Sequence, residues 1–307
     1  MTLFIIGNGF DKAHGFKTGY EDFRDYLNEN DCNIVDNFSL FEFFNNEDES
    51  LWSDFENRLG EVDYEGVVSD YSSDLTDDLS DKEWNWASSN NSYLCEVFED
   101  ILTKFKPCLC QAVSDFVLNA VTYDKELKNT KFSKEFIKDS IFVTFNYSKT
   151  LEKIYAIEDK RIFHIHGLAY YSEIKNNEFS SYNYDEPSII LGHGDFIIEG
   201  DEDDLYEQNP FSPHEILNAL PALLRKDYQT KKLNSFLSNY KNITEIQIIG
   251  HGLGDVDSCY FNQIYDILPY LKKITYWYYR NDIQPENQKL EKLKRYFPGK
   301  EISIVQY

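Results

Sequence analysis

Short apolar runs recur along the chain, separated by amphipathic or polar stretches. Each run is rich in β-branched and aromatic residues and is bounded by polar or glycine-containing segments, which is typical of buried β-strands. Because the runs are continuously apolar, they indicate strands of a sheet that is covered on both faces. The predicted strands span residues 3–6, 140–145, 161–165, 188–191, 245–249, 273–279 and 302–306.

Helical patterns separate the strands of the second half of the chain. The stretches with this pattern lie at residues 213–225, 231–240, 257–271 and 285–297. A further helix is expected over residues 20–30, where Phe23 and Leu27 share one face. Strands that alternate with helices favour parallel pairing through crossover connections. The sequence therefore predicts an α/β fold with a doubly wound, mostly parallel sheet.

The strand pattern disappears over residues 31–139. Short aromatic helices are predicted at residues 38–44 and 51–59, and a stripe of apolar residues between Val97 and Ala120 recurs at helical spacing. We interpret this block as a helical insertion in a single α/β domain that spans residues 1–307. A second polar segment, the acidic run at about residues 196–209, is expected to be a solvated surface loop, with a cover over the site as the alternative.

Glycine-containing turns follow two of the predicted strands. Gly7, Asn8, Gly9, Phe10 and Asp11 come after the first strand, where nucleotides bind in open α/β sheets because glycines let the backbone approach a phosphate. A structural turn that needs glycine explains the same residues without any ligand. Asp11 is interpreted as a helix cap or as a ribose or metal contact.

The second turn is the segment Gly250, His251, Gly252, Leu253, Gly254 and Asp255, which follows the strand at residues 245–249. Its glycines suit the approach of a phosphate or a ribose, so Gly250, His251, Gly252 and Asp255 are candidate ligand contacts. In the alternative interpretation, Asp255 and Asp257 cap the helix that begins near residue 257.

Two further strand ends carry candidate catalytic residues. His166 ends the strand at residues 161–165 and precedes Gly167, which places an imidazole at a sheet edge that small ligands can reach. Strand alternation predicts that His164 and His166 point to the same face, one of them as a packing or hydrogen-bonding residue. Asn146 ends the strand at residues 140–145 and offers a donor and an acceptor, with an Asx turn or helix cap as the structural alternative.

The composition of the chain limits the classes of ligand and the cellular compartment that we expect. The formal net charge is −24, and a basic surface suited to nucleic acid or anionic membrane is therefore not expected. No apolar run reaches the length of a membrane span, and the first run is too short for a signal peptide, so we expect a cytoplasmic protein. The five cysteines are odd in number and scattered, so they imply neither a disulfide framework nor a zinc ribbon.

The chain resembles the AbiH family of bacterial abortive-infection proteins in four ordered segments, namely GNGFDKAHGFKTGYEDF, TFNYSKTLEKIY, HIHG and IIGHGLGDVDSCYF. The resemblance implies a role in phage defence. A nucleotide ligand, a phage-derived trigger or partner protein, and a homo-oligomeric state are all compatible with that role.

A more distant likeness is to sirtuin-like, Rossmann-like NAD-binding domains. Residues 7–11 resemble their Gly-Ala-Gly-x-Ser loop with Asn and Asp substituted, and residues 16–24 resemble the following Gly-Ile-Pro-x-Phe-Arg segment more loosely. Residues 144–146 match a Thr-x-Asn strand end, and residues 166–167 match a catalytic His before Gly. The turn at residues 250–255 takes the place of a ribose-contacting Gly-Ser turn.

This likeness implies chemistry at the nicotinamide–ribose bond of NAD. Asn146 would orient the ribose or an attacking water, and His166 would act as a base towards a ribose hydroxyl. The expected enzyme is an NAD glycohydrolase-like hydrolase. The four-cysteine zinc module of sirtuin deacetylases is absent, so deacetylation of acyl-lysine is not expected.

Two alternatives stay open. The Asn, His and Asp residues at strand ends also resemble those of metal-dependent phosphohydrolases and nucleases, although the usual Asp-x-His and Gly-Asn-His motifs are missing. The third interpretation is a nucleotide sensor without turnover, in which the same pocket binds a signal.

Overall fold

The computed structural model describes residues 1–30, 55–60, 105–124, 126, 130–136, 139–170, 189–194, 224–279 and 285–306. The chain divides into two compact units. Unit 1 comprises Met1–Asp22, Val113–Ile190 and Tyr228–Tyr307, and unit 2 comprises Phe23–Ala112 and Leu191–Asp227. Each unit is described by itself below.

Unit 1 contains a six-stranded sheet in the order β3-β2-β1-β4-β5-β6. Every strand pair in this sheet is parallel, and Thr2 is in register with Ser140 of β2 on one side and with Glu245 of β4 on the other. The predicted α/β class and parallel sheet are thereby confirmed. The strands are β1 (Thr2–Ile6), β2 (Ser140–Thr144), β3 (Ile162–His164), β4 (Glu245–Ile249), β5 (Lys273–Tyr278) and β6 (Glu301–Gln306).

One predicted strand, at residues 188–191, is wrong. Within the described residues 189–194 there are only isolated bridges, an antiparallel one between Ile189 and Gly167 and a parallel one between His193 and Arg225. Ile189 and Leu191 are buried and Ile190 is partly buried, so the hydrophobicity of this run reflects burial rather than strand pairing. Periodicity alone does not separate these two causes in so short a run.

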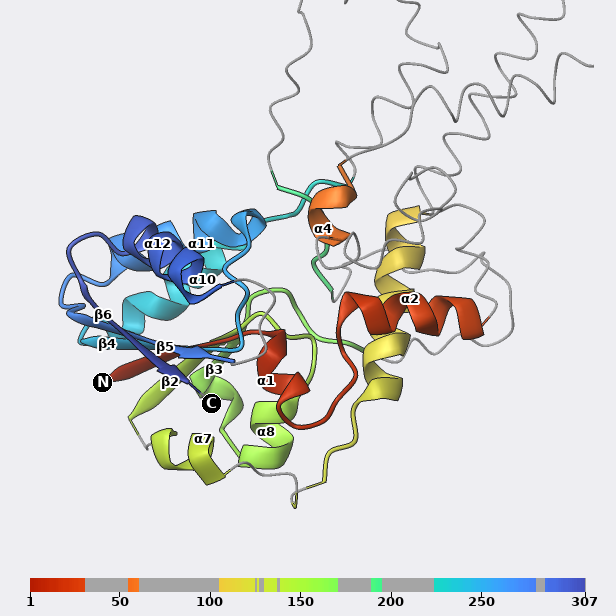
Figure 1. Cartoon of the computed structure of the whole chain (residues 1–307), viewed down its shortest axis with the longest axis horizontal. Coiled ribbons are helices and arrows are strands. Elements are labelled where there is room, and N and C mark those ends of the chain that lie inside the picture. The colour runs from red at the N-terminus through yellow and green to blue at the C-terminus, as the bar shows by residue number, and fades with distance from the viewer. Residues whose placement is uncertain are drawn as a thin grey trace, which may run out of the picture. The chain divides into compact units, whose positions relative to one another are not determined.

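Helices cover both faces of the sheet, as Figure 1 shows. Three helices lie on one face, α10 (Thr230–Leu237), α11 (Ser258–Ile267) and α12 (Glu286–Tyr296). On the other side lie α1 (Asn8–Lys12), α7 (Thr130–Glu135) and α8 (Thr150–Tyr155). Helix α2 (Tyr20–Glu29) follows α1 and agrees with the helix predicted over residues 20–30. Short 3₁₀ turns complete the connections at Asp159–Arg161, Ser238–Tyr240 and Asp255–Asp257.

Successive residues of a strand serve two different cores. On the α10–α12 side, Leu3 and Ile5 of β1 join a cluster of buried aliphatic and aromatic side chains that includes Ile264 and Leu293. On the opposite side, Phe4 stacks on Phe142 with ring centroids 5.2 Å apart. Side chains alternate across a strand, so a strand with two covered faces must be apolar at every position. This accounts for the continuous runs in the sequence.

The predicted insertion over residues 31–139 is described only in part. Residues 105–120 are helical, with Phe105, Leu109 and Phe116 buried, which agrees with the predicted apolar stripe. Helix α4 (Phe55–Arg58) lies within the helix predicted at residues 51–59. The helix predicted at residues 38–44 and the acidic loop at about residues 196–209 lie outside the described residues. The insertion therefore stays a prediction.

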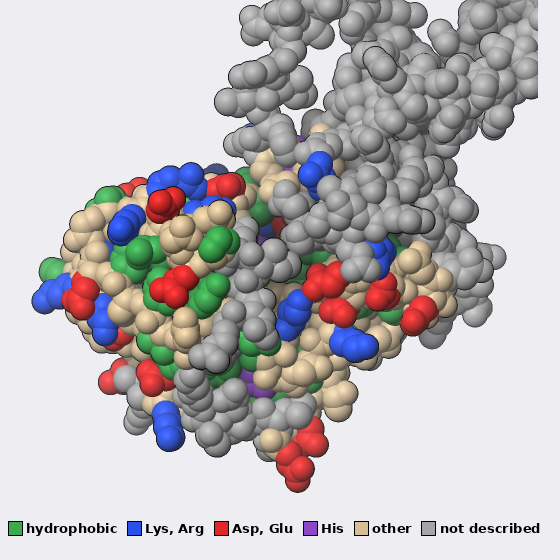
Figure 2. Space-filling model, in the orientation of Figure 1, with side chains coloured by type: hydrophobic (Ala, Val, Ile, Leu, Met, Phe, Trp, Pro, Cys, Tyr) green, Lys and Arg blue, Asp and Glu red, His purple; other side chains and the backbone are tan. Residues whose placement is uncertain are grey.

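Charged side chains are distributed unevenly over the described helices. Figure 2 shows acidic side chains gathered over α2, whose sequence is YEDFRDYLNE, whereas acidic and basic side chains are interspersed over α12.

In unit 2, the fully buried ammonium of Lys226 forms an ion pair with Glu56 at 2.6 Å. A buried charge requires such a partner because desolvation is expensive.

Candidate functional site

The two glycine turns are packed directly against each other. The N–H of Gly7 donates to the carbonyl of Ile249 at 2.9 Å, and the N–H of Gly9 donates to that of Gly250 at 2.8 Å. A Cβ added to Gly250 would lie 2.2 Å from the backbone nitrogen of Phe10, and Gly250 also has a positive φ of +68°. Close approach of two backbones therefore explains these glycines, as the structural interpretation of the first turn expected.

The residues between these glycines lie in different surroundings. Asn8 is exposed, and its side-chain amide bonds to the carbonyl of Thr18 at 2.7 Å and to the Thr18 hydroxyl at 2.6 Å. Phe10 is buried in an aromatic cluster with His14, Phe132 and Tyr155. Neither arrangement requires a ligand, and their predicted contacts with a cofactor stay predictions.

Asp11 is buried and faces the loop that follows β2. Its Oδ2 accepts a hydrogen bond from Ser148 Oγ at 2.5 Å, and its Oδ1 accepts one from Thr150 Oγ1 at 2.7 Å. Burial raises the pKa of Asp11 to about 6, opposed by these two hydrogen bonds and by the nearby amide of Asn146. The side chain does not cap α1, whose N-cap is Gly7, so the interpretation of Asp11 as a helix cap is wrong.

Asn146 lies just beyond β2 and is only 6% exposed. Its backbone N–H donates to Thr144 Oγ1 at 3.1 Å. Its side-chain oxygen and nitrogen are both buried and neither makes a well-aligned hydrogen bond among the described residues, although the amide lies close enough to Asp11 to favour the ionised carboxylate. A buried donor or acceptor left without a partner costs about 1–3 kcal/mol. An ordered water or a polar ligand group would satisfy both atoms.

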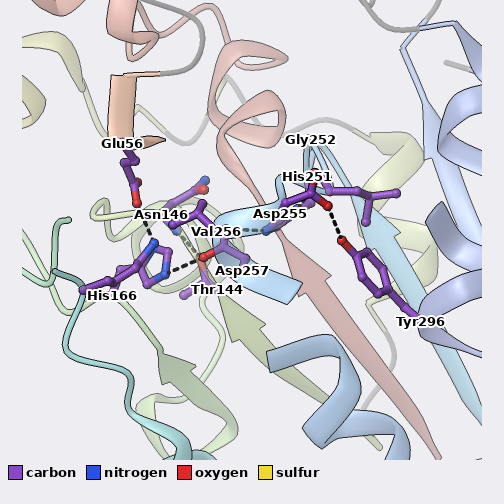
Figure 3. A network of polar contacts seen from close by, with 12 residues as sticks. Glu56, Thr144, Asn146, His166, His251, Gly252, Asp255, Val256, Asp257 and Tyr296 are labelled. Carbon is purple, nitrogen blue, oxygen red and sulfur yellow. Dashed lines mark hydrogen bonds and ion pairs between the residues drawn. The ribbon is translucent and has the colours of Figure 1, made fainter. Parts of the chain in front are cut away.

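Asp257 joins two histidines from different strand ends, as Figure 3 shows. Its Oδ1 lies 3.3 Å from Nε2 of His166, which follows β3, and its Oδ2 lies 3.5 Å from Nε2 of His251, which follows β4. All three side chains are largely buried. A carboxylate in this position orients both imidazole rings and favours a proton on each facing nitrogen.

The hydrogen bonds of His251 define its tautomer. Its Nδ1 accepts a hydrogen bond from the backbone N–H of Leu253 at 2.9 Å, so Nδ1 carries no proton and Nε2 carries the one that faces Asp257. Burial lowers the pKa of His251, and the neighbouring Asp257 opposes that effect. His251 is accordingly a neutral imidazole at neutral pH.

Helix α12 and strand β5 hold the turn that carries His251. Tyr276 donates from its hydroxyl to the carbonyl of His251 at 2.9 Å, and the ammonium of Lys289 donates to the carbonyl of Gly252 at 2.8 Å. The candidate contact Asp255 is exposed and forms an ion pair with Arg295 at 2.6 Å. Partial burial raises the pKa of Asp255, but the hydrogen bond from Arg295 and the charge of Lys292 outweigh this effect and lower the pKa below its usual value. These contacts account for Asp255 without a ligand.

The two histidines of the HIHG segment do not share a face, so that expectation is wrong. Strand β3 ends at His164, and residues 165–166 form a turn. His164 Nε2 lies 2.8 Å from Glu152 Oε1 of α8, whereas His166 contacts Asp257 and the ring of Tyr260 in α11. Alternation of side chains holds only while the strand continues.

The structure therefore brings together Asn146, His166 and His251, from the ends of three different strands, around Asp257. Sequence reasoning missed Asp257 as a site residue because an acidic residue before a helix is usually a cap. Asp257 is indeed the N-cap residue of α11, but its carboxylate makes no cap hydrogen bond. Sequence reasoning also missed Ser148. The polar residues that follow the strand end at Thr144 to Asn146 were the signal that could have indicated it. Within the described ranges, no group of three or more His, Cys, Asp or Glu residues is arranged to hold a metal ion.

Comparisons with known proteins identify one family. Searches of curated proteins and of solved structures each returned no match. Along the described parts of the chain, no helix has the length and apolar character needed to cross a membrane. A family model described as "Bacteriophage abortive infection AbiH" matches residues 3–279. Since that range includes every strand of the sheet except β6 and all four strand ends of the site, the chain belongs to the AbiH family, which implies a role in abortive-infection defence against phage.

Proposed function

We propose that the protein acts in phage defence by binding a nucleotide at the carboxyl ends of β1 to β4 and hydrolysing it. NAD, cleaved at the nicotinamide–ribose bond, is the first candidate substrate. In this proposal Asn146 and His166 contact the reacting part of the substrate, and Asp257 positions His166.

The sheet topology supports a nucleotide as the ligand. The strand order β3-β2-β1-β4-β5-β6 is that of the doubly wound, Rossmann-like sheets that bind dinucleotides. In such sheets the ligand lies outside the carboxyl ends of the strands, near the position where the strand order reverses. Here that position is between β1 and β4, and Asn146, His166 and His251 all follow carboxyl ends nearby.

The observation that carries the proposal is the unsatisfied amide of Asn146. Thr144 and His164 are in register across β2 and β3, so Asn146 and His166 each lie two residues beyond a paired position. Asn146 thus offers one buried donor and one buried acceptor at the same edge of the sheet as the imidazole of His166. A protein retains such an unfavourable group where a ligand satisfies it.

The proposed reaction uses one water molecule. The water oxygen forms a bond to C1′ of the nicotinamide ribose while the bond from C1′ to the nicotinamide nitrogen breaks, and neutral nicotinamide leaves with the electron pair of that bond. The proton of the water passes to His166, and the other product is ADP-ribose. The amide oxygen of Asn146 accepts a hydrogen bond from the water or from a ribose hydroxyl, which holds the reacting atoms in line.

Asp257 and His251 complete this arrangement. One ring nitrogen of His166, Nε2, faces Asp257, and a neutral imidazole always has one nitrogen with the lone pair that a base needs. The carboxylate of Asp257 also stabilises the imidazolium that forms when His166 accepts a proton. His251 remains neutral and anchors the other oxygen of Asp257, so that the carboxylate cannot rotate away.

The test is chromatography of NAD incubated with purified protein, with and without Mg²⁺ or Mn²⁺. The wild type is expected to release nicotinamide and ADP-ribose in equal amounts without a metal. His166→Ala and Asn146→Ala are expected to be slower by at least about a hundredfold. The matched control is Asn239→Ala, because the amide of Asn239 is exposed and bonds only to carbonyls of Ser235 and Phe236 nearby.

A second arm covers a protein that is silent until infection. Cells that express the wild type or His166→Ala are challenged with phage, and their NAD content is followed. NAD loss with the wild type alone supports the proposal. Metal-dependent cleavage of a phosphoester with the nicotinamide–ribose bond intact contradicts it in favour of a phosphohydrolase. NAD that binds but stays intact both in vitro and in infected cells identifies a sensor.

A further inference from the structure

A pocket lies between the α8 region and the end of β3, within unit 1. It has a volume of about 440 Å³. One wall is formed by Lys149, Glu152, Lys153 and Ala156 of the α8 region, and His164 contributes from β3. The proposed hydrolysis uses none of these residues. A volume of this size lies in the range of small-molecule sites, roughly 300–1,000 Å³.

The wall from α8 follows from helical spacing. Residues 149, 152, 153 and 156 are separated by three or four positions, so their side chains share one face of α8. The helix then ends in an αL motif. Ala156 has a left-handed φ of 57°, and its N–H donates to the carbonyl of Glu152 at 3.1 Å. This closure bends the chain sharply beside the pocket.

A hydrogen-bonded pair lies against the pocket. His164 Nε2 and Glu152 Oε1 are 2.8 Å apart, and each side chain is 13% exposed. The remaining polar atoms of the pair, His164 Nδ1 and Glu152 Oε2, are buried and have no hydrogen-bond partner among the described residues. When the shared proton is on Nε2 of a neutral imidazole, both remaining atoms are acceptors. A ligand or a water that donates hydrogen bonds would satisfy both atoms.

Two cations lie on the α8 face of the same pocket. Lys149 and Lys153 are exposed, and in the described part of the chain neither ammonium has an ion-pair partner, unlike Lys160, which pairs with Glu158 at 2.9 Å. Like charges four residues apart on a helix destabilise it unless an anion lies between them. Asp159 also lines the pocket, so an anionic ligand group is favoured only on the lysine side.

From these observations we infer that the pocket binds a small phosphorylated molecule of mononucleotide size. Its phosphate lies between Lys149 and Lys153, and its hydroxyl or amino groups donate to Glu152 Oε2 and His164 Nδ1. The inference does not rest on the proposed hydrolysis, because the residues and the face of the sheet are different.

Isothermal titration calorimetry on the full-length protein tests this site with AMP, ribose 5-phosphate and inorganic phosphate as separate probes. AMP is expected to bind the wild type, and the double variant Lys149→Ala/Lys153→Ala is expected to weaken that binding at least about tenfold. The matched double variant Lys160→Ala/Lys241→Ala removes two exposed lysines outside the pocket and is expected to bind AMP as the wild type does. His164→Phe retains a ring without its nitrogens and is expected to weaken AMP binding without weakening that of inorganic phosphate.

A second measurement does not depend on any variant folding. In the wild type labelled with ¹⁵N-histidine, AMP is expected to shift the ring resonances of His164. The inference is overturned by unshifted resonances, by AMP binding that the lysine pair does not affect, or by AMP binding that is lost in Asn146→Ala instead. Inorganic phosphate that binds as tightly as AMP overturns the mononucleotide-sized ligand, because Glu152 and His164 would then take no part.

Discussion

The hydroxyl of Ser148 donates a 2.5 Å hydrogen bond to the carboxylate of Asp11, from which it is separated by 137 positions in the sequence. This bond joins the loop that carries Asn146 to the first helix of the chain. Burial raises the pKa of Asp11 to about 6 from its ordinary value of 3.8. The folded protein therefore binds a proton at Asp11 more tightly than the unfolded chain does. The corresponding stability is present below about pH 4 and is lost as the pH rises through about 6.

Asp11→Asn is expected to remove this pH dependence. Between about pH 5 and about pH 7.5, the wild type should lose about 1–1.5 kcal/mol of unfolding free energy relative to the variant. Urea unfolding at the two pH values measures the difference. The exposed Asp266, changed to Asn, serves as the control. Parallel pH profiles for the wild type and Asp11→Asn would show that the buried carboxylate does not titrate in this range.

Gly250→Ala is expected to destabilise the protein by about 3 kcal/mol or more, because its Cβ would meet the backbone of Phe10 at a positive φ. Gly252→Ala provides a control in the same turn, since a Cβ there meets no atom within 4 Å. Its unfolding free energy should change by less than about 0.5 kcal/mol. Denaturant unfolding distinguishes the two. Equal effects would contradict the close backbone packing of the two turns.

Asn146→Ala is expected to leave stability unchanged or to raise it by up to about 1 kcal/mol, because it removes two unsatisfied buried polar atoms. The contrasting variant is Asn8→Ala, which removes hydrogen bonds to Thr18 and is expected to cost about 0.5–1 kcal/mol. Thermal unfolding of the ligand-free proteins measures both changes. A large loss in Asn146→Ala would indicate a structural role for its amide rather than a ligand-binding one.

His251 is expected to stay neutral below its ordinary pKa of 6.5, since burial lowers the pKa of the folded state. The unfolded chain then takes up the proton first, so the contribution of His251 to stability is present above about pH 6.5 and is lost as the pH falls. Nitrogen NMR at about pH 6 should show the tautomer with Nε2 protonated. The ring signals of His251 are assigned as those that disappear in His251→Gln. A doubly protonated ring at that pH would contradict the hydrogen bond from Leu253.

Ala156→Gly is expected to stabilise the protein by about 0.5–1 kcal/mol, because Ala156 holds a left-handed conformation that glycine adopts without strain. At Ala13 the same substitution is expected to destabilise by a similar amount, about 0.5–1 kcal/mol, because Ala13 ends α1 with a right-handed φ of −68°. Chemical denaturation of the two variants gives the sign of each effect. A lower unfolding free energy in both variants would contradict the prediction, because it would show that glycine at position 156 does not relieve strain at the end of α8.

The sheet was predictable from the sequence because both of its faces are covered. Strands Thr2–Ile6 and Glu245–Ile249 are mostly apolar and buried at almost every position, and the glycine turns mark where they end. Helix α1 was not predicted, since its five residues are too few for a hydrophobic period to appear. The strand expected at residues 188–191 was wrong because burial and pairing produce the same apolar run.

The site was predictable only to the level of strand ends. Parallel strands bring their carboxyl ends to one edge, so Asn146 and His166 could be expected there. Partners from distant segments could not, because no local pattern reports that Asp257 faces His166 or that Ser148 faces Asp11. The pocket beside α8 depends on the turn after His164, which strand alternation gives no means of foreseeing.

The central position of β1 has a consequence for synthesis on the ribosome. The strand is translated before the other five strands of the sheet, yet its two neighbours are β2 at residues 140–144 and β4 at residues 245–249. Pairings over such separations form slowly because long loops must close before any contact stabilises them. The emerging N-terminal segment has no sheet partner until β2 has been made. His251 and Asp257 follow β4 and can join the site only after β4 has been made.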